Sequence, residues 1–423
     1  MCEESASGGD PMCAKPLVLR GTVSRLDSLA ALAGADVVAL DANGSPSSTV
    51  AITDVSGAYQ LSIPARRTSD GKPQGAEVTL RADAAGYLTF PSGIRQALPI
   101  DTGTPAEERD AFVVMSALTD IGLIALPSAP TGAIAGKVAV PASRTGVLVV
   151  AEGNGAACTA IADTEGAYDI VNVPAGSYVV TAYAKGVSYA PGNVTVTAAR
   201  AAALNLALDT KATATVSGNV QVVNPESGTV TSVILVVEST FNAALARGES
   251  PPGLRAPSPG TAPNVSGAFA IAGVPTGRYV VLAAFENDSL VRDPDVSIGN
   301  TQILHISVAS GVDQSLTSSF KITGALDVLG PGIDVPEAVT AKPQLRWKRD
   351  PGAALYEVHV YDALGLEVWT KPSIVPPGST DLSVAYEGPL VPGMYYQFKA
   401  LSIKQGGSFI STTEDLRGVF FSQ

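Results

Sequence analysis

The sequence is poor in charged, aromatic and cysteine residues. Of its 423 residues 16% are charged and 6% are aromatic, and it has only three cysteines and two histidines. With 46% hydrophobic residues and so little charge, the chain is unlike a disordered protein, which has low hydrophobicity and high net charge. No run of 18 apolar residues occurs, so no transmembrane helix is predicted. The net charge of −12 without a basic patch argues against nucleic-acid binding, since neutralising phosphates supplies much of that affinity.

The scarcity of histidine also narrows the chemistry. His305 and His359 fall in different parts of the chain, and neither belongs to a His-Glu-x-x-His motif of the zinc peptidases. Asp54 and Asp163 lie outside any calcium-type loop of alternating oxygen ligands, so a turn-capping role is expected for both. We predict a protein that is not an enzyme and that uses no metal and no cofactor.

Glycine and proline are abundant instead, with 42 and 30 residues, and they mark an internal repeat. Its full form is Gly-x-Val, then Asp-x-x-Gly-x-Tyr, then Val-Pro-x-Gly-x-Tyr, and residues 136–178 contain all three parts. The central glycines are Gly57, Gly166 and Gly267, so the period is about 100 residues, the size of a module.

Each part of the repeat has a physical reading. Asp-x-x-Gly is typical of a tight turn, in which the Asp side chain bonds to nearby backbone and the glycine takes a positive φ. The alternating apolar and polar residues that follow predict a half-buried strand. Val-Pro-x-Gly predicts a second turn, after which Tyr-x-Val opens another strand. Each copy is therefore predicted to be a small antiparallel β-sandwich.

The repeat resembles the carboxypeptidase regulatory-like family, whose fold is transthyretin-like (prealbumin-like). The resemblance covers roughly residues 17–325, and the second copy carries the whole pattern. The third copy has Asn264 in place of the turn Asp, and the first has a polar stretch, Arg66 to Gly75, in place of Val-Pro-x-Gly. The resemblance implies the fold and says little about function, because such modules serve as appendages in many contexts.

The last part of the chain has a different pattern. Pro343-Gln344-Leu345-Arg346-Trp347 is followed by a strand-like run, Tyr356 to Asp362, and later by Leu390-x-Pro392-x-x-x-Tyr396. These residues resemble a fibronectin type III domain, with Trp347 in the core and Tyr396 forming a tyrosine corner. The chain also resembles uncharacterised envelope lipoproteins of bacteria.

We therefore predict an all-β protein of tandem Ig-like and transthyretin-like antiparallel sandwiches, elongated and multidomain. The predicted parts are a flexible N-terminal tether at 1–16, sandwiches at 17–127, 131–209 and 212–330, and a fibronectin type III-like sandwich at 338–423. The third sandwich has a Pro-rich insertion at 240–263. An insertion of that length is either functional or disordered, and disorder is the expectation.

The beginning of the sequence resembles a mature bacterial lipoprotein, with Cys2 as the lipidation site and an acidic Ser/Gly-rich tether after it. This start predicts a lipid anchor at Cys2 and a location in the cell envelope, as an outer-membrane lipoprotein or at the cell surface. Cys13 and Cys158 then remain as two separate thiols or as a disulfide in an oxidising compartment.

The sequence offers two further candidate sites. Tyr361 and Trp369 are candidates for an exposed aromatic platform that binds carbohydrate, with ordinary packing of Trp369 as the alternative. Lys137 and Asn205 occupy plausible positions for an isopeptide crosslink, but no matching acid is found. The sequence favours a non-catalytic adhesion or binding module for a surface polysaccharide or an envelope protein, and the alternative is a structural spacer or scaffold. It leaves the oligomeric state open.

Overall fold

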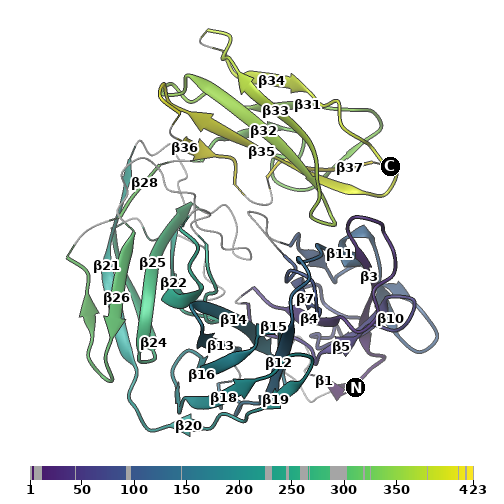
Figure 1. Cartoon of the computed structure of the whole chain (residues 1–423). Coiled ribbons are helices and arrows are strands. Elements are labelled where there is room, and N and C mark those ends of the chain that lie inside the picture. The colour runs from purple at the N-terminus through teal and green to yellow at the C-terminus, as the bar shows by residue number, and fades with distance from the viewer. Residues whose placement is uncertain are drawn as a thin grey trace. The chain divides into compact units, whose positions relative to one another are not determined.

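The structure is a computed structural model, and the all-β prediction is confirmed (Figure 1). Apart from strands, the described residues form two 3-10 turns, η1 (Ala117–Thr119) and η2 (Glu238–Thr240). No helix in the described part of the chain is long and apolar enough to span a membrane. The described residues are 2–3, 12–42, 44–91, 97–143, 145–223, 231–243, 247–257, 265, 267–285, 303–317, 320–323, 325–378, 380–407, 409–414 and 417–422.

The chain divides into two compact units, which we describe separately. Unit 1 contains residues 1–212 with Pro251–Gly253, and unit 2 contains residues 213–250 and 254–423. Unit 1 begins with a short ribbon of β1 (Cys2–Glu3) and β2 (Met12–Cys13), followed by two sandwiches that we call module 1 and module 2.

Module 1 consists of two sheets that enclose one core. Its first sheet contains β11 (Ile121–Leu123), β3 (Leu17–Arg25), β10 (Phe112–Val114), β9 (Ala106–Glu107) and β6 (Ala58–Ile63). Its second sheet contains β5 (Ala51–Ile52), β4 (Asp36–Leu40), β7 (Glu77–Asp83) and β8 (Ile100–Asp101). The core includes Leu19, Val37, Leu61 and Leu80, which come from β3, β4, β6 and β7 of the two sheets.

Module 2 repeats this plan. In strand order, one sheet contains β15 (Ala167–Pro174), β12 (Thr131–Lys137) and β19 (Ala201–Ala203). The other contains β14 (Ala156–Ala162), β13 (Val147–Gly153), β16 (Gly176–Tyr183) and β18 (Gly192–Val196). A further ribbon joins β17 (Ser188–Tyr189) to β20 (Leu208–Asp209). In both modules the first strand pairs antiparallel with the strand after the Asp-x-x-Gly turn and parallel with a late strand.

One backbone carbonyl explains two positions of the repeat at once. In module 2 the Tyr168 hydroxyl donates to the Leu204 carbonyl at 2.7 Å, and a Cβ on Gly136 would overlap that same oxygen. In module 1 Tyr59 donates to the Thr119 carbonyl at 2.6 Å, which likewise occupies the side-chain position of Gly21. The glycine of Gly-x-Val therefore makes room for the carbonyl that the tyrosine binds.

The Pro-x-Gly-x-Tyr segment is also held by its tyrosine. The Tyr178 hydroxyl donates to the Pro174 carbonyl at 2.9 Å, and in unit 2 Tyr279 donates to Pro275 at the same distance. Each ring is buried while its hydroxyl closes the turn four residues earlier, so one side chain fixes both the core and the connection.

The first sandwich of unit 2, module 3, has the same plan. One sheet contains β24 (Gly267–Val274), β21 (Ala214–Val223), β27 (Gln314–Ser315) and β28 (Phe320–Thr323), and the other contains β23 (Arg255–Ala256), β22 (Thr231–Val237), β25 (Gly277–Phe285) and β26 (Leu304–Val308). Phe269 replaces the hydroxyl-bearing tyrosine of the other copies.

The expectation of a disordered insertion at 240–263 is wrong for much of its length. Pro251 to Ala256 are buried, and Leu254 is fully so. The Leu235 amide donates to the Leu254 carbonyl at 3.0 Å, and β23 pairs with β22. The insertion therefore adds a strand to module 3, because its apolar residues and free backbone groups complete an open sheet edge. Residues 244–246 and 258–264 lie outside the described part.

The terminal module has the strand order of a fibronectin-like sandwich. One sheet contains β29 (Val328–Gly330), β31 (Gln344–Trp347) and β34 (Leu382–Ala385). The other contains β30 (Glu337–Val339), β37 (Val419–Ser422), β35 (Tyr395–Ile403), β32 (Leu355–Asp362), β33 (Glu367–Ile374) and β36 (Phe409–Thr412). Trp347 is fully buried, as expected, and Tyr396 accepts the Val391 amide at 2.9 Å in the expected tyrosine corner.

The terminal module begins earlier than the predicted residue 338. Strand β29 pairs with β31, and Leu326 and Val328 belong to the same core as Trp347. The segment assigned to the end of the third sandwich thus supplies the first strand of the next module. Residues 331–337, which lie between the two predicted sandwiches, are therefore inside this module.

Candidate functional site

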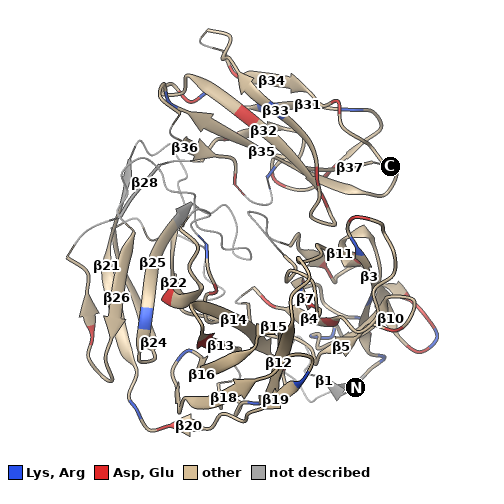
Figure 2. Ribbon diagram, viewed as in Figure 1, with Lys and Arg blue, Asp and Glu red and all other residues tan. Residues whose placement is uncertain are grey.

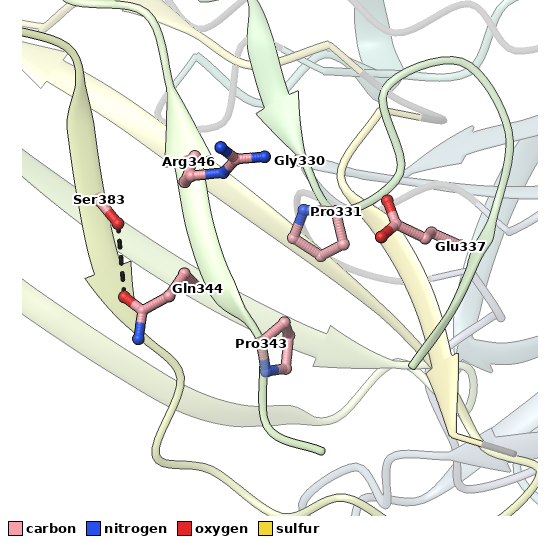
Figure 3. A pocket seen from close by; sticks show the side chains of 7 residues that line it. All are labelled: Gly330, Pro331, Glu337, Pro343, Gln344, Arg346 and Ser383. Carbon is pink, nitrogen blue, oxygen red and sulfur yellow. Dashed lines mark hydrogen bonds between the residues drawn. The ribbon is translucent and has the colours of Figure 1, made fainter. Parts of the chain in front are cut away.

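The candidate site is a groove on the terminal module, lined by four polar side chains together with two prolines and a glycine (Figure 3). It has a volume of about 350 Å³, which falls within the range of small-ligand sites. The lining residues are Gly330, Pro331, Glu337, Pro343, Gln344, Arg346 and Ser383. They come from β29 and Pro331 after it, from the first residue of β30, from β31 with the residue before it, and from β34.

Strand alternation places the polar side chains in the groove. Leu345 and Trp347 of β31 point into the core, so Gln344 and Arg346 lie on the outer face. On the neighbouring strand β34, Ser383 lies outward between two buried residues and is the Cα partner of Arg346. The peptide bond between Gly330 and Pro331 is cis, and the loop that follows reaches Glu337.

The groups in the groove are partly held by one another and by backbone. The Arg346 Nη2 group donates a hydrogen bond to the Leu329 carbonyl at 2.8 Å. Figure 3 shows the guanidinium turned toward Gly330 and Pro331. Ser383 donates to the Gln344 side-chain oxygen at 3.3 Å, and Glu337 accepts the Gly332 amide at 2.9 Å. The planar guanidinium has further N–H groups that can donate to oxygen atoms of a ligand.

The predicted aromatic platform is not formed. Tyr361 is 6% exposed, and its ring stacks on His359 with 6.4 Å between centroids. Trp369 is half-buried and packs edge-on against Tyr386 at 5.5 Å, beside the core. Trp369 is the Cα partner of Val360 rather than of Tyr361, so the two aromatic side chains do not share a surface. Packing of Trp369, the alternative expectation, is what the structure has.

The cysteines do not form the disulfide considered from the sequence. Cys158 on β14 is a free thiol, and burial raises its pKa above the ordinary value. It packs beside the core of module 2. Cys2 and Cys13 are Cα partners in the ribbon of β1 and β2, and lipidation of Cys2 stays a prediction.

The other candidate residues have structural roles. Asp54 accepts the amides of Ser56 and Ala58, and Asp163 accepts those of Glu165 and Ala167, so the turn-capping prediction is confirmed for both. The described residues contain no group of His, Cys, Asp and Glu that could hold a metal ion.

The two histidines and the crosslink pair are also placed. His305 lies 2.7 Å from Glu238, and His359 lies 3.2 Å from Glu367, both on strand surfaces. The Lys137 backbone amide donates to the Asn205 side-chain oxygen at 2.8 Å, and the Lys137 residue is exposed.

Sequence reasoning missed the groove residues and two residues of β15, Asp169 and Asn172. The sequence did contain a signal for the second pair. At these positions the next repeat copy has Ala270 and Gly273, so the two polar side chains belong to module 2 alone. For the groove the alternation around Trp347 predicts outward side chains, but only the tertiary structure brings them to Pro331 and Glu337.

Comparison with known proteins adds one family match. Residues 130–204 match the family described as polysaccharide lyase family 4, domain II. The match covers module 2 alone and does not assign the whole chain to that family. No curated protein matches the chain significantly.

Several solved structures are similar at low identity. The Bacillus anthracis TIE protein is 12% identical, covers 92% of this chain and has a TM-score of 0.18, and this chain spans 65% of that protein. BcpA, the major pilin subunit of Bacillus cereus, is 11% identical over 73% of this chain and 99% of its own, with a TM-score of 0.20. GBS52, the minor pilin of Streptococcus agalactiae, is 11% identical over 49% and 100%, with a TM-score of 0.19. At such scores the fold assignment rests on the strand order described above.

Proposed function

We propose that the chain is a non-catalytic protein of the bacterial cell surface or envelope, which binds a polysaccharide or a protein partner through its terminal module. The observation that carries this proposal is the open groove around Arg346. It combines donors, acceptors and two proline faces on the outside of a rigid sheet, which suits recognition of a polar ligand.

The polarity of the groove argues for hydrogen-bonded recognition. Arg346 and Gln344 present N–H groups, and Glu337 presents a carboxylate, so sugar hydroxyls or peptide groups could be bound from both sides. The low content of charged residues, visible as sparse colour in Figure 2, makes a purely electrostatic mode a weaker explanation. A lipid anchor at Cys2 would tether such a binding module to a membrane surface.

The test is retention on immobilised envelope polysaccharide and on envelope protein, using the full chain with Cys2→Ser. We expect binding that Arg346→Ala reduces at least tenfold. Lys404→Ala removes a cation from an exposed turn of the same module outside the groove and should leave binding unchanged. Equal loss in both variants would point to general charge effects, and no retention at all would contradict a binding role.

The second candidate is a structural spacer or scaffold, and one feature of unit 1 favours it. Modules 1 and 2 are joined by several side-chain hydrogen bonds as well as by the linking chain. Such bonds restrict the motion expected of modules on a simple tether. If the chain is retained on neither polysaccharide nor envelope protein and the motion between these modules is restricted, a spacer is the better explanation of its function.

A further inference from the structure

Module 2 covers the outer face of a module 1 sheet. Along β7 the residues Val78, Leu80 and Ala82 face the core of module 1, so Arg81 and Asp83 face outward. Both are nevertheless largely buried, with side-chain exposures of 7% and 13%. Arg81 lies 3.4 Å from the Thr159 hydroxyl of β14, which identifies module 2 as the cover.

A single asparagine aligns the two modules. The Asn172 side chain donates to the carbonyls of Ala84 and Tyr87 at 3.0 and 2.8 Å, and it accepts the Gly86 amide at 2.6 Å. Its amide group thus binds the whole turn at residues 84–87 of module 1. Asn172 has a φ of +59°, a left-handed conformation that Asn adopts more readily than most residues.

Three carboxyl groups meet at this interface. Asp36 of β4 and Asp83 of β7 are Cα partners on adjacent strands, where like charges repel. Asp169 of β15 enters from module 2, and its Oδ1 atom is buried without a hydrogen-bond partner. Arg81 bonds Asp83 at 3.1 Å, and the Thr89 hydroxyl also donates to Asp83.

A further acid at the interface, Asp163, differs from Asp36 and Asp169 in its hydrogen bonding. Asp163 of module 2 accepts the Val50 amide of module 1 at 3.3 Å as well as the amides of its own turn. It is therefore a hydrogen-bonded carboxylate, whereas Asp36 and Asp169 lose water and lie near another negative charge.

We propose that this acidic cluster makes the docking of module 2 on module 1 depend on pH. Docking tightens when Asp36 or Asp169 takes up a proton, and it loosens when both carry a negative charge beside the Arg81–Asp83 ion pair. The Asn172 contact sets the alignment at either pH, because it carries no charge.

The direction follows from the protonation of the docked state. Burial, then the charges of Asp169 and Asp83, raises the pKa of Asp36 from 3.8 to about 6, and burial with Asp83 raises the pKa of Asp169. A group with a raised pKa binds a proton more tightly when docked, so docking gains as pH falls through about 6 toward 3.8. For Asp36 alone, the pKa change from 3.8 to about 6 corresponds to a gain of about a hundredfold in the docking equilibrium.

The test measures the distance between modules in the full chain by pulsed electron resonance. Spin labels are placed at Val55→Cys in module 1 and Thr195→Cys in module 2, both exposed positions, with Cys2→Ser, Cys13→Ser and Cys158→Ala. We expect a narrower distance distribution at pH 5.0 than at pH 7.5. Asp36→Asn, and independently Asp169→Asn, should give the narrow distribution at both values.

Two further variants complete the design. Asp70→Asn removes an exposed charge of module 1 outside the interface and should behave as the parent does. Asn172→Ala should broaden the distribution at both pH values, since it removes the neutral contact. The proposal is overturned if the parent distribution does not change with pH, or if Asp36→Asn and Asp169→Asn both keep the parent's pH response.

Discussion

At the scale of single residues, the carbonyl of Leu204 links two distant motif positions. It fills the space beside Gly136 and accepts the hydroxyl of Tyr168. We expect Tyr168→Phe to lower the free energy of unfolding by about 1 kcal/mol, because one buried hydrogen bond is lost while the ring remains. Urea unfolding followed by circular dichroism measures this, and an unchanged midpoint would show that the bond contributes nothing.

Gly136→Ala should cost more than Tyr168→Phe. The new methyl group would overlap the Leu204 carbonyl, so β12 and β19 would have to separate or bend. Overpacking of this kind costs about 1–3 kcal/mol, in addition to any loss of the tyrosine bond. The same unfolding experiment ranks the two variants, and the reverse order would contradict this account of the repeat.

Residue roles were predictable where alternation is regular. The core positions of Trp347 and Tyr396 follow from pattern and spacing, since each faces one side of a regular strand. The burial of Tyr361 could not be predicted from alternation. The pairing of β32 with β33 shifts register between Val360 and Tyr361, and the consecutive residues Val360 to Ala363 are all buried.

At the scale of elements, the tyrosine corner offers a matched pair of neighbours. Tyr396 accepts the Val391 amide, whereas Tyr395 stacks on Phe421 with 4.8 Å between centroids. We expect Tyr396→Phe to destabilise the terminal module by about 1–3 kcal/mol, because a backbone donor loses its partner. Tyr395→Phe keeps the stacking and should cost less than about 0.5 kcal/mol. Unfolding monitored by the fluorescence of Trp347 and Trp369, both in this module, separates the two variants, and equal effects would contradict the corner's role.

The sequence of one strand, β13, indicates that module 2 is covered on its outer face. Residues Val147–Ala151 of β13 are continuously apolar and are buried on both faces of the sheet. A sandwich strand with one face in water alternates apolar and polar residues, whereas a run like this is typical of a strand covered on both sides. The run indicates a cover without saying which surface provides it, so the interface itself required the structure.

At the scale of the whole molecule, the repeat predicts three sandwiches and the pattern around Trp347 and Tyr396 predicts a fourth, but the predicted boundary at residue 338 is wrong. The stretch Gly330–Pro336 is rich in glycine and proline, which is typical of a linker. It nevertheless lies inside the terminal module, because β29 before it pairs with β31. Composition marks a turn equally well within a module and between modules, and only strand pairing distinguishes them.

This boundary gives a prediction for fragments of the chain. Residues 325–423 contain β29 and the core residues Leu326 and Val328, so this fragment should fold and unfold cooperatively. Residues 338–423 lack both side chains and leave the β31 edge unpaired. Each lost apolar side chain contributes about 1.5–3 kcal/mol when buried, so the shorter fragment should be destabilised by about 3–6 kcal/mol or fail to fold. Trp347 fluorescence during denaturation reports both fragments. Equal stability of the two fragments would show that β29 does not stabilise the terminal module, and it would support the predicted boundary at residue 338.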